Sequence, residues 1–222
     1  MWALKIKARE RWNVYNSRTK KFKVKVYSYS QNYYEEKGKY FYVGSGIVVG
    51  PEKNKKAFFA DFKKDPKVEV FEINDDYFTC IYSELKSAAR AEIVKIAYNP
   101  RLIFPKPVIT DEEGWEEWEI ASPKRSDLEA FVYVVRKNPI ECKLYYLKKQ
   151  KITNVMVYTL LPKLSEKQRA VILLAVEQGY YGYPRGITLE KLAKIAKISL
   201  STFQFHLAKA EAKLLPFVAK KL

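Results

Sequence analysis

Apolar and polar residues alternate through much of the first 150 positions, and this spacing of two predicts β-strands. The opening residues, MWALKIK, already follow the pattern. Further runs are rich in β-branched and aromatic residues, which fit a pleated and half-buried surface. These runs predict strands at 23–29, 40–49, 68–73, 77–82, 92–97, 103–109, 115–120 and 140–147.

Two helices are predicted among these strands. One covers Pro51 to Lys64, where apolar residues recur at helical spacing and a proline suits the first turn. The other begins at a capping box, in which Ser126 caps the amide of Glu129, and it ends at Asn138-Pro139. A hairpin turn is predicted at Glu113-Gly114. The apolar face of the second helix consists of Leu128, Phe131, Val132 and Val135.

The order of these elements predicts the fold class. Two β-β-α-β units follow one another at about 22–73 and 103–147, which indicates a duplicated α+β layout with two sheets covered by helices. We therefore expect an α+β sensor or dimerisation domain at 1–150. A connector at 151–163 follows, and its apolar middle favours a strand or packed segment over a free linker.

From residue 164 the pattern becomes purely helical, with three helices expected in a domain at 164–222. Ser165 and Gln168 form a capping box at the first helix, and Gly179 ends that helix in the left-handed conformation. Thr188 caps the second helix and Ser199 the third. The apolar positions of the third helix are Leu200, Phe203, Leu207, Ala210 and Leu214. A short helix, a tight turn and a longer helix with a small and polar face are typical of a helix-turn-helix.

The residue types on that third helix suit double-stranded DNA, because a helix fits the major groove and its capped N-terminus suits a phosphate. Gln204 can pair with adenine through two hydrogen bonds, and Phe205 or the Thr202 methyl group can touch thymine methyl groups. The expected base contacts are Ser201, Thr202, Gln204 and Phe205. The expected phosphate contacts are Arg185, Lys194, Lys197, Ser199, Lys209 and Lys213.

Charge strengthens this interpretation. The chain carries 41 Lys and Arg against 25 Asp and Glu, a net charge of +16, and such a positive field attracts polyanions. A lysine-rich thermophile surface is the alternative, although such surfaces usually balance lysine with glutamate. Residues 164–222 contribute ten Lys and Arg against four Asp and Glu, so the excess also lies outside the motif.

The segment from Leu164 to Leu215 resembles the bacterio-opsin activator type of helix-turn-helix, which is found in many archaeal regulators. The matching landmarks are LSEKQR at 164–169, GYY at 179–181, Pro184-Arg185, Thr188-Leu189, Leu192-Ala193, Ile198-Ser199, Ser201-Thr202, His206-Leu207 and AEAKL at 210–214. The resemblance covers about a quarter of the chain and implies transcriptional regulation, often by a dimer. The sequence departs from the family at Lys197, where glycine is common, and at Phe205, where a polar residue is usual.

Other functions remain open at this point. The Tyr- and Lys-rich stretch from Phe22 to Tyr42 can stack single-stranded nucleic acid, although such residues more often cover a half-buried sheet or an interface. An enzyme in the N-terminal domain is a third hypothesis, which a pocket with two or more polar side chains of shifted ionisation would favour. No phosphate loop, nucleophile elbow or metal-ligand spacing supports it, and we expect no cofactor and no metal. Cys80 and Cys142 are expected as buried thiols.

The sequence thus favours a non-enzymatic homodimer that regulates transcription, with half-sites about 34–36 Å apart or a multiple of that. The N-terminal domain would sense a small-molecule effector or mediate assembly. A cytoplasmic location is expected because the start of the chain has no signal-peptide pattern. The longest plain apolar run, Ala170 to Val176, is too short to cross a bilayer.

Overall fold

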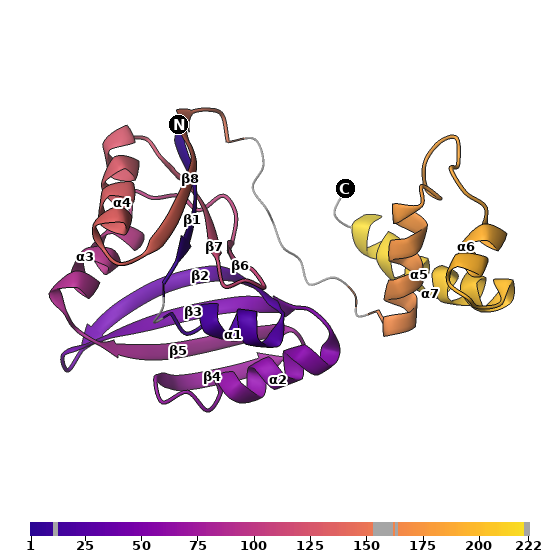
Figure 1. Cartoon of the computed structure of the whole chain (residues 1–222), viewed down its shortest axis with the longest axis horizontal. Helices are drawn as coiled ribbons and strands as arrows, with labels where there is room; N and C mark the ends of the chain where they lie inside the picture. The colour runs from indigo at the N-terminus through magenta and orange to yellow at the C-terminus, as the bar shows by residue number, and fades with distance from the viewer. Residues whose placement is uncertain (11–12, 153–161, 163, 220–222) are drawn as a thin grey trace. The chain divides into compact units, whose positions relative to one another are not determined.

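A computed structural model describes residues 1–10, 13–152, 162 and 164–219 of the chain (Figure 1). The chain divides into two compact units, Met1–Val157 and Tyr158–Leu222, and each is described by itself. The predicted connector at 151–163 lies almost entirely outside the described residues. Within the described part of the chain, no helix has the length and the apolar character that crossing a membrane requires.

The first unit is built on one eight-stranded antiparallel sheet, in the order β4-β5-β3-β2-β6-β7-β1-β8. Its strands are β1 (Trp2–Arg9), β2 (Lys25–Glu36), β3 (Lys39–Val49), β4 (Val68–Asn74), β5 (Tyr77–Leu85), β6 (Val108–Thr110), β7 (Glu116–Ser122) and β8 (Glu141–Lys149). The prediction of two separate sheets is wrong. Pairing of β2 with β6 at Val26 to Ser28 joins the two halves into one sheet.

In the part of the first unit that the structure describes, four helices accompany this sheet, two more than the sequence predicted: α1 (Asn16–Phe22), α2 (Glu52–Phe62), α3 (Ala88–Ala97) and α4 (Arg125–Lys137). The predicted β-β-α-β order is present twice, as β2-β3-α2-β4 and as β6-β7-α4-β8. The α+β class is therefore confirmed, with the repeat embedded in one continuous sheet.

Two of the predicted strands are wrong or too long. Residues 92–97 lie in α3, which begins behind Ser87, whose side chain accepts a hydrogen bond from the Arg90 amide. Of residues 103–109 only the end enters β6, and Ile103 forms a single bridge to Ala121. Pro105 and Pro107 explain the short strand, because proline has no amide hydrogen for a sheet ladder.

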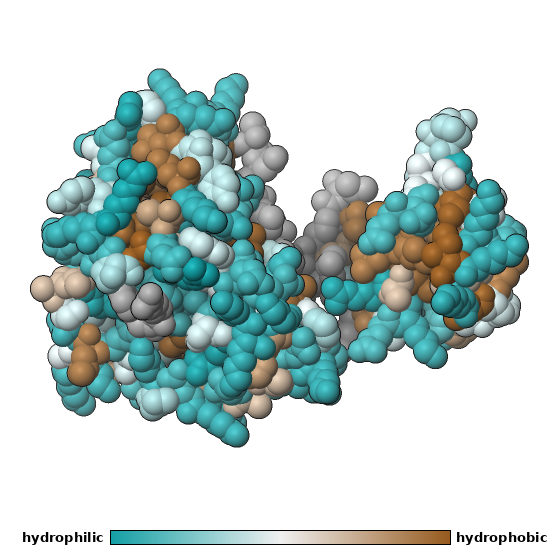
Figure 2. Space-filling model, in the orientation of Figure 1, coloured by the Kyte–Doolittle hydropathy of each residue, from teal (hydrophilic) through white to brown (hydrophobic). Residues whose placement is uncertain are grey.

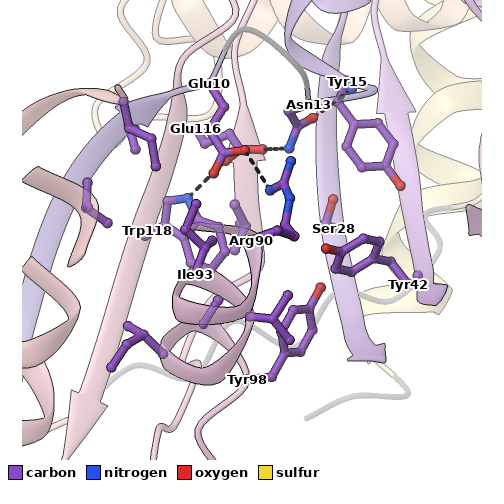
Figure 3. Close-up of a pocket in the computed structure, with 18 of the residues that line it drawn as sticks. Glu10, Asn13, Tyr15, Ser28, Tyr42, Arg90, Ile93, Tyr98, Glu116 and Trp118 are labelled. Carbon is purple, nitrogen blue, oxygen red and sulfur yellow. Dashed lines mark hydrogen bonds and ion pairs between the residues drawn. The ribbon is translucent and has the colours of Figure 1, made fainter. Parts of the chain in front are cut away.

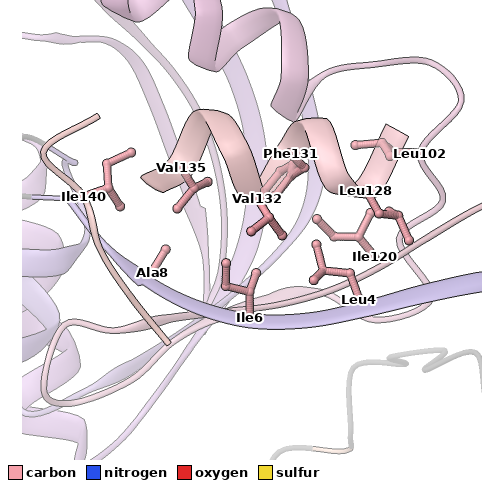
Figure 4. Packing of buried hydrophobic residues seen from close by; sticks show 10 residues of the cluster. All are labelled: Leu4, Ile6, Ala8, Leu102, Ile120, Leu128, Phe131, Val132, Val135 and Ile140. Carbon is pink, nitrogen blue, oxygen red and sulfur yellow. The ribbon is translucent and has the colours of Figure 1, made fainter. Parts of the chain in front are cut away.

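The predicted capping box at Ser126 is also wrong, although the helix itself is correct. Helix α4 begins at Arg125, so Ser126 already lies in its first turn. The Asp127 carboxylate instead accepts hydrogen bonds from Ser122 and Arg101. The predicted apolar face is confirmed, because its four residues are buried against β1 and β7 in one core cluster (Figure 4).

The predicted hairpin turn at Glu113-Gly114 is confirmed between β6 and β7. Gly114 adopts a φ of +79°, and a Cβ atom there would lie 2.6 Å from the carbonyl oxygen of Asn16. Glycine is therefore required at this position both by conformation and by space.

The second unit contains α5 (Glu166–Glu177), α6 (Leu189–Ile195) and α7 (Leu200–Ala219). The capping box of Ser165 and Gln168 is present, Gly179 has a φ of +73°, and the Thr188 side chain caps α6, as predicted. Its core is a small cluster of buried side chains from all three helices and from the loop after α5: Val171, Ala175, Tyr180, Leu192, Ala193, Phe203 and Leu207.

Candidate nucleic-acid interface

The turn between α6 and α7 has a defined backbone geometry. The Lys197 amide donates to the Lys194 carbonyl oxygen at 3.1 Å, and the Ile198 amide donates to the Ala193 carbonyl oxygen at 3.1 Å. This pair of bonds is a Schellman motif, which needs a left-handed residue just past the helix. Lys197 occupies that position with a φ of +54°, so the lysine adopts the conformation that favours glycine.

The N-terminus of α7 is capped by a hydroxyl cluster. The Ser199 Oγ accepts a hydrogen bond from the Thr202 amide at 3.1 Å, which confirms Ser199 as the cap. The same oxygen lies 2.7 Å from the Thr202 hydroxyl and 3.0 Å from the Ser201 hydroxyl. The cluster is exposed, and the first-turn amides behind it lie at the positive end of a 20-residue helix.

Helix α7 has two distinct faces. Phe203, Leu207 and Ala210 are buried, and at about 100° per residue they form one stripe toward α5 and α6. The four predicted base contacts, Ser201, Thr202, Gln204 and Phe205, are all exposed. Ser201 and Phe205 lie opposite the buried stripe, whereas Thr202 and Gln204 flank it. All four residues are therefore on the exposed surface of the helix, as the sequence predicted.

Phe205 is the largest side chain on this exposed face, with 53% of its surface accessible. The Lys209 Nζ lies 4.3 Å from the centre of its ring, so the two side chains form a cation–π pair. An exposed aromatic ring held beside a lysine combines an apolar surface with a positive charge. Both groups face away from the core of the unit.

The predicted phosphate contacts do not all come together. Lys194, Lys197 and Ser199 gather around the α6–α7 turn and are exposed. The Arg185 guanidinium lies 4.7 Å above the Tyr180 ring, in the loop before α6. Lys213 is set apart, because its Nζ donates to Gln168 Oε1 at 3.2 Å, beside the start of α5.

The loop between α5 and α6 also holds an aromatic residue that the sequence argument did not select. Tyr183 is fully exposed, two residues before Arg185. The run of three tyrosines at 180–183 was the available signal, because surface tyrosine is enriched where a protein meets a partner. Among the described residues, no group of three His, Cys, Asp or Glu side chains could hold a metal ion.

Comparison with known families agrees with this geometry. Residues 164–216 match a family model described as "HTH DNA binding domain". The match begins just before α5 and ends within α7, so it covers the capping box, the α6–α7 turn and the exposed face of α7. A search of curated proteins finds no match to the chain. Residues 164–216 are therefore a helix-turn-helix DNA-binding domain of the bacterio-opsin activator type.

Proposed function

We propose that this protein is a sequence-specific transcription regulator that binds double-stranded DNA with α7 in the major groove. The observation that carries the proposal is the exposed face of α7 beside a capped helix terminus, within a matched DNA-binding domain. A helix fits the width of the major groove, where each base pair presents a distinct pattern of donors and acceptors.

The proposed base contacts are the four exposed residues of the first turns of α7. The Gln204 amide can pair with adenine through two hydrogen bonds, which is worth about 1–3 kcal/mol of discrimination. The Phe205 ring offers an apolar surface for a thymine methyl group. Ser201 and Thr202 lie one turn earlier and can donate or accept hydrogen bonds at base edges.

Backbone contacts would surround this face. Lys194, Lys197 and Ser199 lie at the entry to α7, where the helix terminus itself favours a phosphate. Lys209 extends the positive charge along the exposed face, and Arg185 adds charge from the preceding loop. Lys213 is the weakest of the six predicted contacts, because it is bound to Gln168.

A homodimer would present two α7 helices to half-sites about 34–36 Å apart or a multiple of that. Apolar surface on α5 supports this part of the proposal, since Leu173 and Val176 are exposed one turn apart. Figure 2 shows hydrophobic patches on the surface of the second unit. The first unit would provide assembly or effector sensing. We place the protein in the cytoplasm, where its DNA partner lies.

The structure gives less support to a single-stranded nucleic-acid binder. Tyr40 and Tyr42, on which that alternative depended, are each only 5% exposed and cannot stack bases as they stand. The family match concerns a domain typical of non-enzymatic regulators. The enzyme hypothesis required a pocket with two or more polar side chains of shifted ionisation. A cavity of the first unit contains Glu116 and Tyr98, whose pKa values burial raises.

Lys209 and Lys213 of α7 provide a matched test, because replacing either one with alanine removes one charge from the same helix. Binding of the full chain to a duplex would be measured by fluorescence anisotropy from 50 to about 300 mM salt. Lys209→Ala should weaken binding and reduce the slope of log affinity against log salt by about 0.9, as expected for one lost phosphate contact. Lys213→Ala should reduce the slope much less, because the Lys213 Nζ is bound to Gln168. Equal effects of both variants would show only generic attraction to the charged unit.

A further inference from the structure

A cavity of about 110 Å³ lies inside the first unit, between the two halves of the sheet (Figure 3). Its walls come from the end of β1 and from β3, β5 and β7, and α3 and α4 close it with apolar side chains such as Ile93, Val94 and Val135. All of its lining residues precede residue 141, so the cavity belongs to the first unit alone.

Glu116, at the start of β7, is the acidic group buried in this cavity, with 5% of its surface exposed. Its carboxylate accepts hydrogen bonds from Asn13 Nδ2 at 2.8 Å and from Trp118 Nε1 at 3.3 Å. Neither donor carries a charge, and no ion pair of Glu116 is found among the described residues. The carboxyl group therefore lacks a counter-ion in the described part of the site.

The nearby arginine does not supply one. Arg90 of α3 forms ion pairs with Glu10 at 3.3 Å and with Glu84 of β5 at 2.7 Å, so two carboxylates already compensate its single charge. Burial, together with the Glu10 carboxylate, raises the pKa of Glu116 to about 8. At neutral pH the side chain consequently holds a proton, and the cavity would gain negative charge if that proton left.

Aromatic rings cover the wall that faces these acids. The Tyr42 ring stacks on the Tyr82 ring with 4.9 Å between the ring centres, and its centre lies 6.1 Å from that of the Tyr98 ring. Figure 3 shows the hydroxyl groups of Tyr42 and Tyr98 turned toward the interior of the cavity. The Tyr42 hydroxyl is buried and has no hydrogen-bond partner among the described residues. A buried polar group without a partner costs free energy, and the lone pairs of this hydroxyl oxygen can face a positively charged group in the cavity.

We propose that this cavity binds a small organic cation with an apolar body, with its charge beside the Glu116 carboxylate and the tyrosine ring faces. Ring faces and a carboxylate both attract a cation, and the apolar side chains of α3 and α4 suit its body. An anion is disfavoured, because the carboxylates of Glu10 and Glu84 outnumber the Arg90 charge among the described residues that line the cavity. A neutral molecule would gain no attraction from the charge of ionised Glu116.

Binding would be coupled to proton release. The bound cation stabilises ionised Glu116, so the protonated carboxyl gives its proton to solvent as the ligand enters. The affinity should therefore rise about tenfold per pH unit below pH 8 and level off above it. The other charged groups among the described residues of the cavity are Glu10 after β1, Glu84 of β5 and Arg90 of α3. Its tyrosines are Tyr15, Tyr42, Tyr82 and Tyr98. Burial raises the pKa of all four tyrosines above the ordinary range, so they stay neutral and do not release this proton.

The test uses the full chain without DNA, so its outcome is independent of the helix-turn-helix domain. Isothermal titration calorimetry would compare tetramethylammonium, whose charge does not titrate and whose size suits a cavity of about 110 Å³, with tert-butyl alcohol, which has a similar size without charge. At pH 7 we expect the cation to bind with release of about 0.9 proton, measured from the enthalpy in phosphate and in Tris. The neutral probe should bind at least tenfold more weakly at pH 8.

Two variants separate charge from shape. Glu116→Gln keeps the size of the protonated acid and a polar side chain, but it cannot ionise. It should therefore reduce the affinity for the cation at pH 8 at least tenfold and abolish proton release. Tyr42→Phe should retain the preference for the cation and its pH dependence, because the acid remains. Saturation by both probes with equal affinity would overturn the proposal. So would an unchanged affinity in Glu116→Gln, or no saturable binding of the cation at millimolar concentrations.

Discussion

Replacing Lys197 with glycine should stabilise the DNA-binding unit. Lys197 is held in the left-handed region, with a φ of +54°, by the two hydrogen bonds that end α6. That conformation costs a residue with a side chain about 1–2 kcal/mol relative to glycine. Glycine loses more entropy on folding, which offsets about 0.4–1 kcal/mol. The net gain for Lys197→Gly is therefore about 0.5–1 kcal/mol.

The end of α5 provides a matched control with the residue types reversed. Gly179 has a φ of +73°, and the same two bonds form there, from Gly179 to Val176 and from Tyr180 to Ala175. A Cβ atom on Gly179 would meet its nearest neighbour at 3.9 Å, which is ordinary contact. The expected loss of about 1 kcal/mol in Gly179→Ala would thus be conformational and not steric.

Amide hydrogen exchange on the full chain, followed by mass spectrometry, measures this effect locally. Peptides from α6 and α7 should exchange about two- to fivefold more slowly in Lys197→Gly and faster in Gly179→Ala. All four tryptophans precede residue 119, so their fluorescence follows the first unit and should not change. Equal or faster exchange in Lys197→Gly would refute the strain argument. Lys197→Gly should also bind DNA more weakly, because it removes a positive charge beside α7. A gain in stability together with a loss of affinity would indicate that the strained lysine is retained for DNA binding.

Three further predictions concern stability. Glu116→Gln should lose less stability between pH 5 and pH 8 than the wild type, as measured by tryptophan fluorescence in urea. In the folded wild type a pKa raised to about 8 keeps Glu116 protonated, whereas in the unfolded chain the carboxyl group ionises near its ordinary pKa of 4.5. The wild type therefore loses about 1.4 kcal/mol per pH unit in this window and none above it. An identical pH slope in the variant would contradict the buried acid. Phe203→Ala should cost about 3–5 kcal/mol and reduce helical circular dichroism, whereas exposed Phe205→Ala should cost less than about 0.5 kcal/mol. Gly114→Ala should lower the melting temperature, because its Cβ would collide with Asn16, and an unchanged temperature would refute that clash.

The second unit could be predicted in detail because its signals are local. A capping box, a helix-ending glycine and a serine cap each depend on residues within four positions, and all three are present. The position of Lys197 was also identifiable, since the glycine that is common there in the family indicates a left-handed residue. The Lys197 side chain is exposed, whereas the Lys213 side chain is bound to Gln168 of α5. This difference depends on how α5 packs against α7, which the spacing of residues in the sequence does not reveal.

The first unit was predicted less completely because its decisive contacts are distant in sequence. Residues 92–97 fit both a strand and a helix, and packing of Ile93 and Ile96 against the core of α4 selects the helix. The cavity depends on sheet topology, which pairs Ala8 of β1 with Glu116 of β7 and so brings Glu10 toward a residue more than 100 positions away. No local motif could reveal that arrangement.

The central claim is that the exposed face of α7 recognises base pairs. The most direct measurement selects bound duplexes from a random library with the full chain at about 150 mM salt, near physiological ionic strength, and repeats the selection with Gln204→Ala and Lys209→Ala. We expect a palindromic motif that loses preference at one position per half-site in Gln204→Ala and keeps its sequence, at lower affinity, in Lys209→Ala. Enrichment without a motif, or a motif that Gln204→Ala leaves intact, would contradict base recognition by this face.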